Sequence, residues 1–377
     1  MSMRERVIRR SWPTGSIDLL LRAGASADAE ARRAWTQWVG THDFDRLTWE
    51  EMRLIAAFSE RIVTLDPSSP LNPRIQGLTK HLWTSTQLAM LQAANAFEQF
   101  VRADIPFIVL KGGALHAEGF GPSCRRVMGD VDILIRPEAA RKAIDILTDS
   151  GWSSVNGESP AFLRRLADIR ISGNYRKGRH GDLDLHSTPF HFSRANRFLD
   201  DALWAAARPV QLSLRPVLVP DAADAIVVSL AHAPHSKGGD WAVDVLTRIA
   251  HQPIDWAKLA KVATERRLVL SCLSGLRYLR DVLGAAVPDT VIETLGESRV
   301  SAGDYLKYRS NVSDRKERKL VDKALNRLAD RLLGREDYSL FVKDRAAVTV
   351  TRSAPRIATF RAGQSLEIPP PAWNLVQ

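Results

Sequence analysis

The chain has 377 residues, of which 45% are hydrophobic and 25% charged, a composition typical of a globular protein with more than one domain. Lysine and arginine exceed aspartate and glutamate by 53 to 43, and the net charge of +10 suits either an anionic partner, such as a nucleoside triphosphate or RNA, or a solvated basic surface. No apolar stretch approaches the roughly 20 residues of a membrane span, no signal-peptide pattern is present, and two cysteines fit a reducing compartment, so we expect a cytoplasmic protein without a membrane partner.

Residues 1–104 are predicted to form an N-terminal helical region. Apolar residues recur at helical spacing in Ala27–Val39 and in Trp49–Val63, and a longer helix is expected from about Thr79 to Ala103. Two prolines in Asp66–Pro70 interrupt this pattern. These patterns predict a packing role for the region and no chemistry.

Residues 105–192 have the pattern of an α/β core. The apolar run Phe107–Leu110 is typical of a buried strand, and Gly129–Ile135 opens with the polar–apolar alternation of a strand. The other predicted elements are a helix start at Ala114–Glu118, a helix from Pro137 to Gly151, and strands at Arg170–Tyr175 and Asp182–His186 joined by the turn Arg176–Gly181. This order predicts an α+β fold with a mixed sheet.

Residues 193–345 are predicted to form a C-terminal helical domain. Its expected helices are Arg197–Ala207, Asp221–His232, Trp241–Ala250, Asp255–Glu265, Ser271–Leu283 and a basic helix at Asp314–Leu333. Because ligand sites favour domain boundaries, this domain is expected to supply part of the pocket for a second, acceptor substrate. Residues 346–377, rich in Thr, Pro and Arg, are predicted to be a strand-like or irregular tail. The oligomeric state is not indicated.

Two pairs of aspartates are candidates for chemistry. Asp130 and Asp132 share one face of their predicted strand, with Cβ atoms about 6–7 Å apart, and Asp182, Asp184 and His186 repeat this spacing on a later strand. If the strands are neighbours, two carboxylates about 5 Å apart repel by roughly 3 kcal/mol at an effective dielectric of about 20. A divalent cation or a protonated carboxylate would offset that repulsion, and oxygen ligands favour Mg²⁺ or Mn²⁺.

Such carboxylates can support phosphoryl chemistry with two metal ions. Ions roughly 3.5–4 Å apart, bridged by Asp130 and Asp132, are the arrangement for in-line displacement at phosphorus. Asp184 would hold the ion on the attacking oxygen and could accept the proton of the acceptor. The alternative is that the aspartates merely face solvent on a half-exposed sheet.

A glycine pair follows the first predicted strand. Lys111, Gly112 and Gly113 stand where a helix start leaves backbone N–H groups free, and a polyphosphate can approach a main chain that carries no side chains. Arg126, four residues before Asp130, could neutralise phosphate charge. A simple tight turn is the alternative explanation for the glycines.

Three segments carry a combined pattern: Ile105–Leu115, Arg126–Ile135 and Asp184–His186. Together they resemble a bacterial nucleotidyltransferase family that is similar to a branch of the polymerase-beta-type superfamily. The similarity covers about residues 80–265, including a familial stretch at Ala231–Leu259. The resemblance implies a mixed-sheet catalytic core followed by a helical region.

The resemblance also implies an activity and its residues. The activity is transfer of a nucleoside monophosphate from an Mg-bound nucleoside triphosphate, ATP among them, to an acceptor, with release of pyrophosphate. Gly112 and Gly113 fall on the glycine loop, and Asp130, Asp132 and Asp184 fall on the metal ligands. The acceptor could be a small molecule, a peptide or an RNA end.

Two other functions are compatible with these patterns. Gly113 replaces a serine that is usual in the superfamily and so removes a hydroxyl contact to phosphate, which favours a non-catalytic nucleotide- or RNA-binding module with the same fold. The other alternative is a phosphotransferase or toxin-like enzyme acting on tRNA or protein. It would share the metal site and differ in the group transferred.

Histidines and a basic cluster complete the candidates. His186 is expected to orient Asp184, to contact the nucleotide, or to be a hydrogen-bonded strand histidine. His232 and His235, with Asp244, superficially suggest zinc, but no cysteine or third histidine is spaced to complete a site. A basic cluster flanks the predicted strands, either to receive an RNA or phosphorylated acceptor or as a solvated rim. Its members are Arg164, Arg165, Arg170, Arg176, Lys177 and Arg179.

Overall fold

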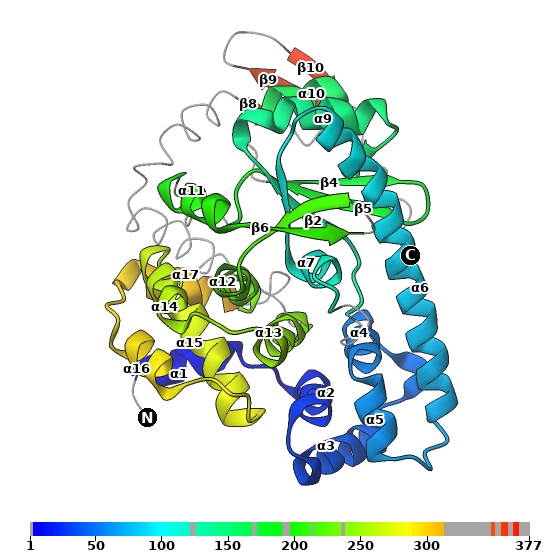
Figure 1. Ribbon diagram of the computed structural model, residues 1–377, viewed down its shortest axis with the longest axis vertical. Helices are drawn as coiled ribbons and strands as arrows, with labels where there is room; N and C mark the ends of the chain where they lie inside the picture. Colours follow the sequence, from blue (N-terminus) through cyan, green and yellow to red (C-terminus); the bar gives the residue numbers. More distant parts are fainter. Residues whose placement is uncertain are drawn as a thin grey trace.

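A seven-stranded mixed sheet forms the centre of the protein, with helices packed around it (Figure 1). The computed structural model describes residues 3–120, 126–167, 172–190, 197–212, 215–234, 238–312, 348–350, 356–360 and 365–368. The predicted α+β class, with a mixed-sheet core and helical flanks, is confirmed. Within the described part of the chain, we find no helix that combines the length and the apolar character needed to cross a membrane.

The helices of the described residues fall before, within and after the sheet. Before it lie α1 (Met3–Ile8), α2 (Gly15–Ala25), α3 (Asp28–Thr41), α4 (Trp49–Ala57), α5 (Ser59–Leu65) and α6 (Asn72–Arg102). Among the strands lie α7 (Lys111–Ala117), α9 (Ala140–Asp149), α10 (Pro160–Leu166) and α11 (Arg197–Ala206). After them lie α12 (Ala222–His232), α13 (Asp240–His251), α14 (Trp256–Glu265), α15 (Val269–Arg277), α16 (Asp289–Glu297) and α17 (Ala302–Val312).

The strands of the large sheet run in the order β3-β4-β5-β2-β1-β7-β6. Their bounds are β1 (Phe107–Val109), β2 (Val131–Ile135), β3 (Ser153–Ser154), β4 (Ser172–Lys177), β5 (Gly181–His186), β6 (Arg208–Leu212) and β7 (Arg215–Val219). β2 pairs parallel with β5 and antiparallel with β1, while β7 pairs parallel with β1. The sheet is therefore mixed, and β2 lies at its centre.

Alternation along the strands gives the sheet two different faces. One face carries Val131, Ile133 and Leu183, which join a large core with α6 and α9. On the opposite face, Leu134 packs with Leu203 of α11, and the neighbouring strand β5 presents the polar side chains of Asp182, Asp184 and His186. One face of the sheet thus packs against helices, and the other carries polar side chains that could take part in a reaction.

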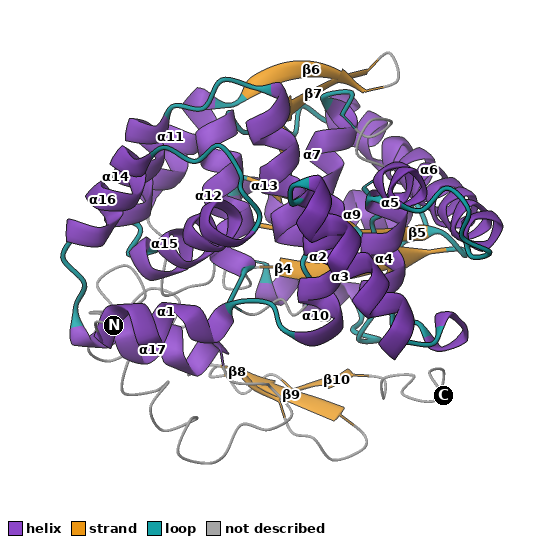
Figure 2. Ribbon diagram, turned by 90° about the horizontal axis from the view of Figure 1, so that it is seen from below, coloured by secondary structure: helices purple, strands orange, loops and turns teal. Residues whose placement is uncertain are grey.

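The helices before and after the sheet share one hydrophobic core. Trp38 from the N-terminal region is buried in the same cluster as Trp241 and Leu273 from the C-terminal region. Helix α6 continues from this helical part and runs along the sheet (Figures 1 and 2). The two helical regions therefore meet on one side of the α/β core, although they are far apart in the sequence.

Several predicted elements need correction. The predicted helix Trp49–Val63 is divided at Phe58 into α4 and α5, and β4 extends through Arg176–Lys177, which the sequence pattern assigns to a turn. The turn is shorter because Gly178 adopts a positive φ of 58°. The sheet also contains two strands from the stretch predicted to be a helical domain, β6 and β7.

The C-terminal predictions are tested only in part. The predicted helix at Asp314–Leu333 lies outside the described residues. In the tail, the described residues form a three-stranded antiparallel sheet of β8 (Val348–Val350), β9 (Arg356–Phe360) and β10 (Ser365–Ile368). The strand-like part of the tail prediction is confirmed for these segments.

Gly181 begins β5 under tight packing, and this leads to a stability prediction. A Cβ at this position would lie 2.5 Å from the carbonyl oxygen of Lys177. Because that neighbour is backbone, Gly181→Ala is expected to lower the free energy of unfolding by about 1–3 kcal/mol in urea denaturation. At Gly77, inside α6, an added Cβ would meet no atom within 4 Å, so Gly77→Ala should raise it by about 0.5–1 kcal/mol. A neutral result at position 181 would contradict this packing account.

Candidate active site

Parallel pairing of two strands brings the candidate aspartates together. Asp132 on β2 is in register with Asp184 on β5, and Leu134 is in register with His186. Because side chains alternate along a strand, Asp184 and His186 lie on the same face as Asp132. That face is the polar one, and the two strands are neighbours, which is the condition under which the sequence pattern brings their acids together.

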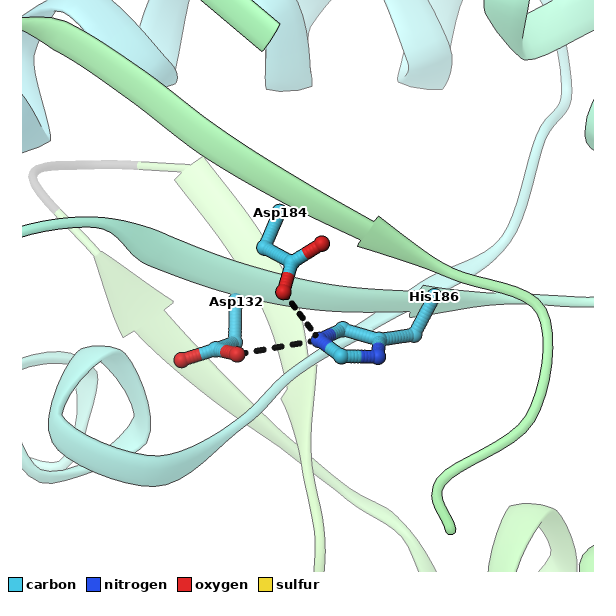
Figure 3. A group of neighbouring side chains, drawn as sticks. All are labelled: Asp132, Asp184 and His186. Atoms are coloured by element: carbon cyan, nitrogen blue, oxygen red, sulfur yellow. Dashed lines mark hydrogen bonds and ion pairs between the residues drawn. The ribbon is translucent and has the colours of Figure 1, made fainter. Parts of the chain in front are cut away.

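Asp132, Asp184 and His186 form a compact cluster (Figure 3). The Nε2 atom of His186 lies 2.9 Å from Oδ1 of Asp132 and 3.1 Å from Oδ2 of Asp184. The Nζ atom of Lys111 approaches the same Asp132 oxygen at 2.5 Å. The contact of His186 with Asp184 fits both the predicted orienting role and a hydrogen-bonded strand histidine.

Burial and these contacts shift the pKa of each group. Burial alone would raise the pKa of Asp132, but the Lys111 and His186 cations outweigh it and hold that pKa well below its usual range. Burial alone would lower the pKa of His186, but hydrogen bonds to Asp132 and Asp184 raise it to about 9. At neutral pH the cluster therefore contains the Asp132 carboxylate, the His186 imidazolium and the Lys111 ammonium group.

Cationic side chains of the protein thus offset the repulsion between the carboxylates. The sequence pattern predicts a metal ion or a protonated carboxylate in this role. Lys111, whose pKa burial would lower but the Asp132 charge raises, neutralises one side of the cluster, and His186 neutralises the other. These cations stabilise the charged form of Asp130 less than that of Asp132. Burial, followed by the charge of Asp132, raises the pKa of Asp130 to about 6. Asp130 lies just before β2 and outside the compact cluster.

The cluster still has a donor atom suited to a metal ion. The Oδ1 atom of Asp184 is buried and has no hydrogen-bond partner among the described residues. The candidate ligand atoms of Asp132, Asp184 and His186 all lie within 4.8 Å of one another. A buried carboxylate oxygen without a donor is costly in an apolar setting, and a hard divalent cation is a suitable partner for it. The residues present therefore fit a metal site.

A pocket of about 200 Å³ lies against the aspartates. Three parts of the chain line it: α4 of the N-terminal region, the α/β core, and α12 with α13 of the C-terminal region. The lining residues are Arg53, Lys111, Gly112, Arg126, Met128, Gly129, Asp130, Asp132, Ser229, His232, Asp240, Trp241 and Asp244. The C-terminal helices α12 and α13 supply part of this wall.

The structure separates the predicted nucleotide-binding residues into two groups. Lys111 and Gly112 line the pocket, whereas a Cβ at Gly113 would lie 2.8 Å from Cγ1 of Val109, so this glycine allows α7 to pack closely on β1. Arg126 also lines the pocket, but its Nε atom is 2.6 Å from Oδ1 of Asp244. The charge of Arg126 is thus already paired with a carboxylate of α13.

The remaining candidates lie away from the cluster or take other partners. Asp182 is on the same face as Asp184, yet its carboxylate lies 3.2 Å from Nε of Arg176 and is not part of the compact group. This arrangement favours Asp184 as the third acid. His232 lines the pocket, and His235 lies outside the described residues. Among the described residues, the Asp132 cluster is the one group that could hold a metal through acidic, His or Cys ligands.

Sequence reasoning missed Arg53 and Asp240. Arg53 lies in a helix whose sequence pattern predicts only a packing role, and its Nη1 atom is 2.5 Å from Oδ2 of Asp240 on α13. Nothing in the local pattern of α4 distinguishes Arg53 from other basic residues on helices. Only the shared core of the two helical regions brings these residues to the pocket.

The raised pKa of His186 predicts how stability depends on pH. The folded protein holds the His186 proton more tightly than the unfolded chain, so this contribution is complete below the ordinary pKa of 6.5 and is lost as pH rises toward about 9. In EDTA, we expect the free energy of unfolding to fall by on the order of 1–3 kcal/mol across that window. Urea denaturation of the wild type and of His186→Gln tests this. Parallel pH profiles for the two proteins would contradict it.

Comparison with protein families identifies a relationship for this arrangement. A family model described as an uncharacterised nucleotidyltransferase matches residues 43–284. The matched segment includes every residue of the Asp132 cluster and every pocket-lining residue. The searches of curated proteins and of solved structures gave no match.

Proposed function

The chain belongs to this nucleotidyltransferase family, and from that premise we propose that it transfers a nucleoside monophosphate from a nucleoside triphosphate to an acceptor, releasing pyrophosphate. The convergence of Asp132 and Asp184 beside a pocket is the observation that supports the proposal most strongly. We further propose that the family is a branch of the polymerase-beta-type superfamily, of bacterial origin, and that the protein acts in the cytoplasm.

The acidic residues would bind metal in two places, with Asp132 and Asp184 at one ion and Asp130 at a second. Asp132 and Asp184 would hold a magnesium or manganese ion, which when bound acts as a Lewis acid on phosphate oxygens. Asp130, outside the compact cluster, is the residue that a second ion would require. The Oδ1 atom of Asp184 would be its metal ligand, because its other oxygen is held by His186.

The basic residues position these acids and the nucleotide. Lys111 and His186 hold Asp132 in one orientation, which keeps the site pre-organised before substrate arrives. Lys111 also lines the pocket, so its ammonium group can exchange from the carboxylate to a phosphate oxygen. Gly112 lines the pocket next to Met128, since an added Cβ would lie 2.9 Å from the Met128 Cγ atom.

Labelled nucleotides test the proposed reaction even though the acceptor is unidentified. The protein would be incubated with a cell extract, Mg²⁺ and each of the four NTPs, labelled either at the α- or at the γ-phosphate. We expect the α label to appear in the modified acceptor, while the γ label leaves as pyrophosphate and does not reach the acceptor. Transfer of the γ label would instead indicate a phosphotransferase and overturn the proposal.

A non-catalytic nucleotide- or RNA-binding module is the second candidate. The packing of Gly113 against Val109, away from the pocket lining, is the observation that favours it, because the second glycine then serves the fold. Nucleotide binding with neither label transferred, in the presence of the full set of extract components, is the result that this candidate predicts. The intact acids at positions 132 and 184 argue for turnover.

A further inference from the structure

Arg53 extends the candidate site into the N-terminal helices. It lies on α4, and its side chain lines the same pocket as Asp130 and Asp132. Building on the proposed function, we propose that Arg53 binds the polyphosphate of the nucleoside triphosphate. The N-terminal helical region would then be part of the nucleotide site and not only a packing partner of the core.

The guanidinium group of Arg53 is held from one side. Its Nη1 atom lies 2.5 Å from Oδ2 of Asp240, and the group stacks over the Trp49 ring at 5.5 Å from the centroid. The side chain is 17% exposed, so most of the cost of ordering it has been met before a ligand arrives. Asp240 and Trp49 therefore orient the arginine toward a fixed position in the wall.

One donor of Arg53 has no acceptor. The Nε atom is buried and makes no hydrogen bond within the described structure. A buried polar group without a partner calls for an explanation, such as a water molecule, an ion or a functional contact. A phosphate is the acceptor that best suits a guanidinium, because its oxygens match the planar fork of donors and carry the opposite charge.

Arg53 suits this role better than Arg126, the arginine predicted from the sequence. Arg126 has two carboxylates near it, with Nε at 2.6 Å from Asp244 and Nη1 at 3.5 Å from Asp240. It is also held by a hydrogen bond to the carbonyl of Val127. Arg126 therefore ties the segment before β2 to α13, while Arg53 keeps an unpaired Nε donor in the wall of the pocket that Asp130 and Asp132 also line.

Binding of magnesium tripolyphosphate, which has no base or sugar, isolates the proposed contact. Calorimetry would compare the wild type with Arg53→Gln, and we expect the variant to bind about 10- to 100-fold more weakly, the effect of one charge-assisted hydrogen bond. Arg53→Lys, which keeps the charge but loses the fork, should be intermediate. Adenosine and the other nucleosides should bind both proteins equally.

Arg61 provides a matched control. It is another arginine of the N-terminal helices with one carboxylate partner, its Nη2 atom lying 2.6 Å from Asp28, and it does not line the pocket. Arg61→Gln should bind tripolyphosphate like the wild type. Because Asp240 also has Arg126 nearby, Arg53→Gln should keep the wild-type melting temperature within a few degrees.

The outcomes separate this proposal from the proposed function. If the wild type and Arg53→Gln bind tripolyphosphate and all four NTPs equally, Arg53 is not a phosphate ligand, while the nucleotidyltransferase proposal stands. If the wild type binds neither tripolyphosphate nor any NTP with magnesium, the proposed function fails and the Arg53 proposal fails with it.

Discussion

Replacing Asp132 by asparagine is expected to lower kcat for nucleotidyl transfer by about 10³-fold or more. Asp132 is the central acid of the cluster, with Lys111 and His186 both bound to its Oδ1 atom. Loss of its charge would weaken metal binding, and a metal contributes several kcal/mol to the stabilisation of charge in the transition state. By transition-state theory, about 4 kcal/mol corresponds to a 10³-fold change in rate.

Asp182 supplies the matched control for this experiment. It has the same side chain on the same sheet face, but it pairs with Arg176 and is not part of the cluster. Asp182→Asn should retain kcat within about tenfold of the wild type, below the 10- to 100-fold loss typical of residues that hydrogen-bond to metal ligands. Equal losses in the two variants, measured as pyrophosphate release at saturating magnesium, would show that the cluster is not the catalytic centre.

The buried ion pair between Arg248 and Glu118 predicts the largest effect on stability. Arg248 Nη1 lies 2.8 Å from Glu118 Oε2, and both side chains are only 2% exposed. The pair joins α13 to the end of α7, the helix that contains Lys111 and Gly112. Arg248→Met would leave a buried carboxylate without this cation, and we expect the free energy of unfolding to fall by about 3–5 kcal/mol.

A double variant separates the loss of the pair from the loss of packing. Glu118→Gln combined with Arg248→Met removes both charges and should recover much of the stability lost in the single variant. Arg102→Met breaks an exposed pair with Glu98 on α6 and should cost less than about 0.5 kcal/mol. Urea denaturation gives all three values. A single variant as stable as wild type would show that Glu118 is satisfied by its other partners, Arg208 and Gln252.

The strands of the active site can be predicted from the sequence because their apolar runs and their alternation are local patterns. Apolar runs identify β1 and β2, and strand alternation puts Asp132 on the polar face of β2, whereas Asp130, expected on the same strand, lies just before it. The spacing from Asp184 to His186 follows the same rule. What the spacing cannot give is the register of β2 with β5, which selects Asp184 over Asp182.

Strands β6 and β7 show why part of the fold was missed. Each is a short run with a proline in it, Pro209 and Pro216, and proline within a run argues against a strand. Their place in the sheet depends on pairing of β7 with β1, more than 100 residues earlier in the chain. Local propensity does not contain such a pairing.

The pocket wall was missed for a related reason. Arg53 and Asp240 meet because α4 and α13 pack together in the shared helical core. Their separation in the sequence is large, and each residue alone has the appearance of an ordinary exposed charge on a helix. Long-range packing therefore determines where Arg53 and Asp240 lie in the pocket wall, while strand periodicity determines which face of the sheet carries the acids.

Magnesium-dependent NTP binding tests the central claim most directly. Calorimetry with each of the four NTPs would compare the wild type with an Asp130→Ala/Asp132→Ala double variant, with EDTA as the control. We predict binding by the wild type that needs magnesium, is lost in the double variant and reveals the preferred base. Failure of the wild type to bind any NTP, or equally tight magnesium-dependent binding by the double variant, would contradict the assignment of these aspartates to a nucleotidyltransferase site.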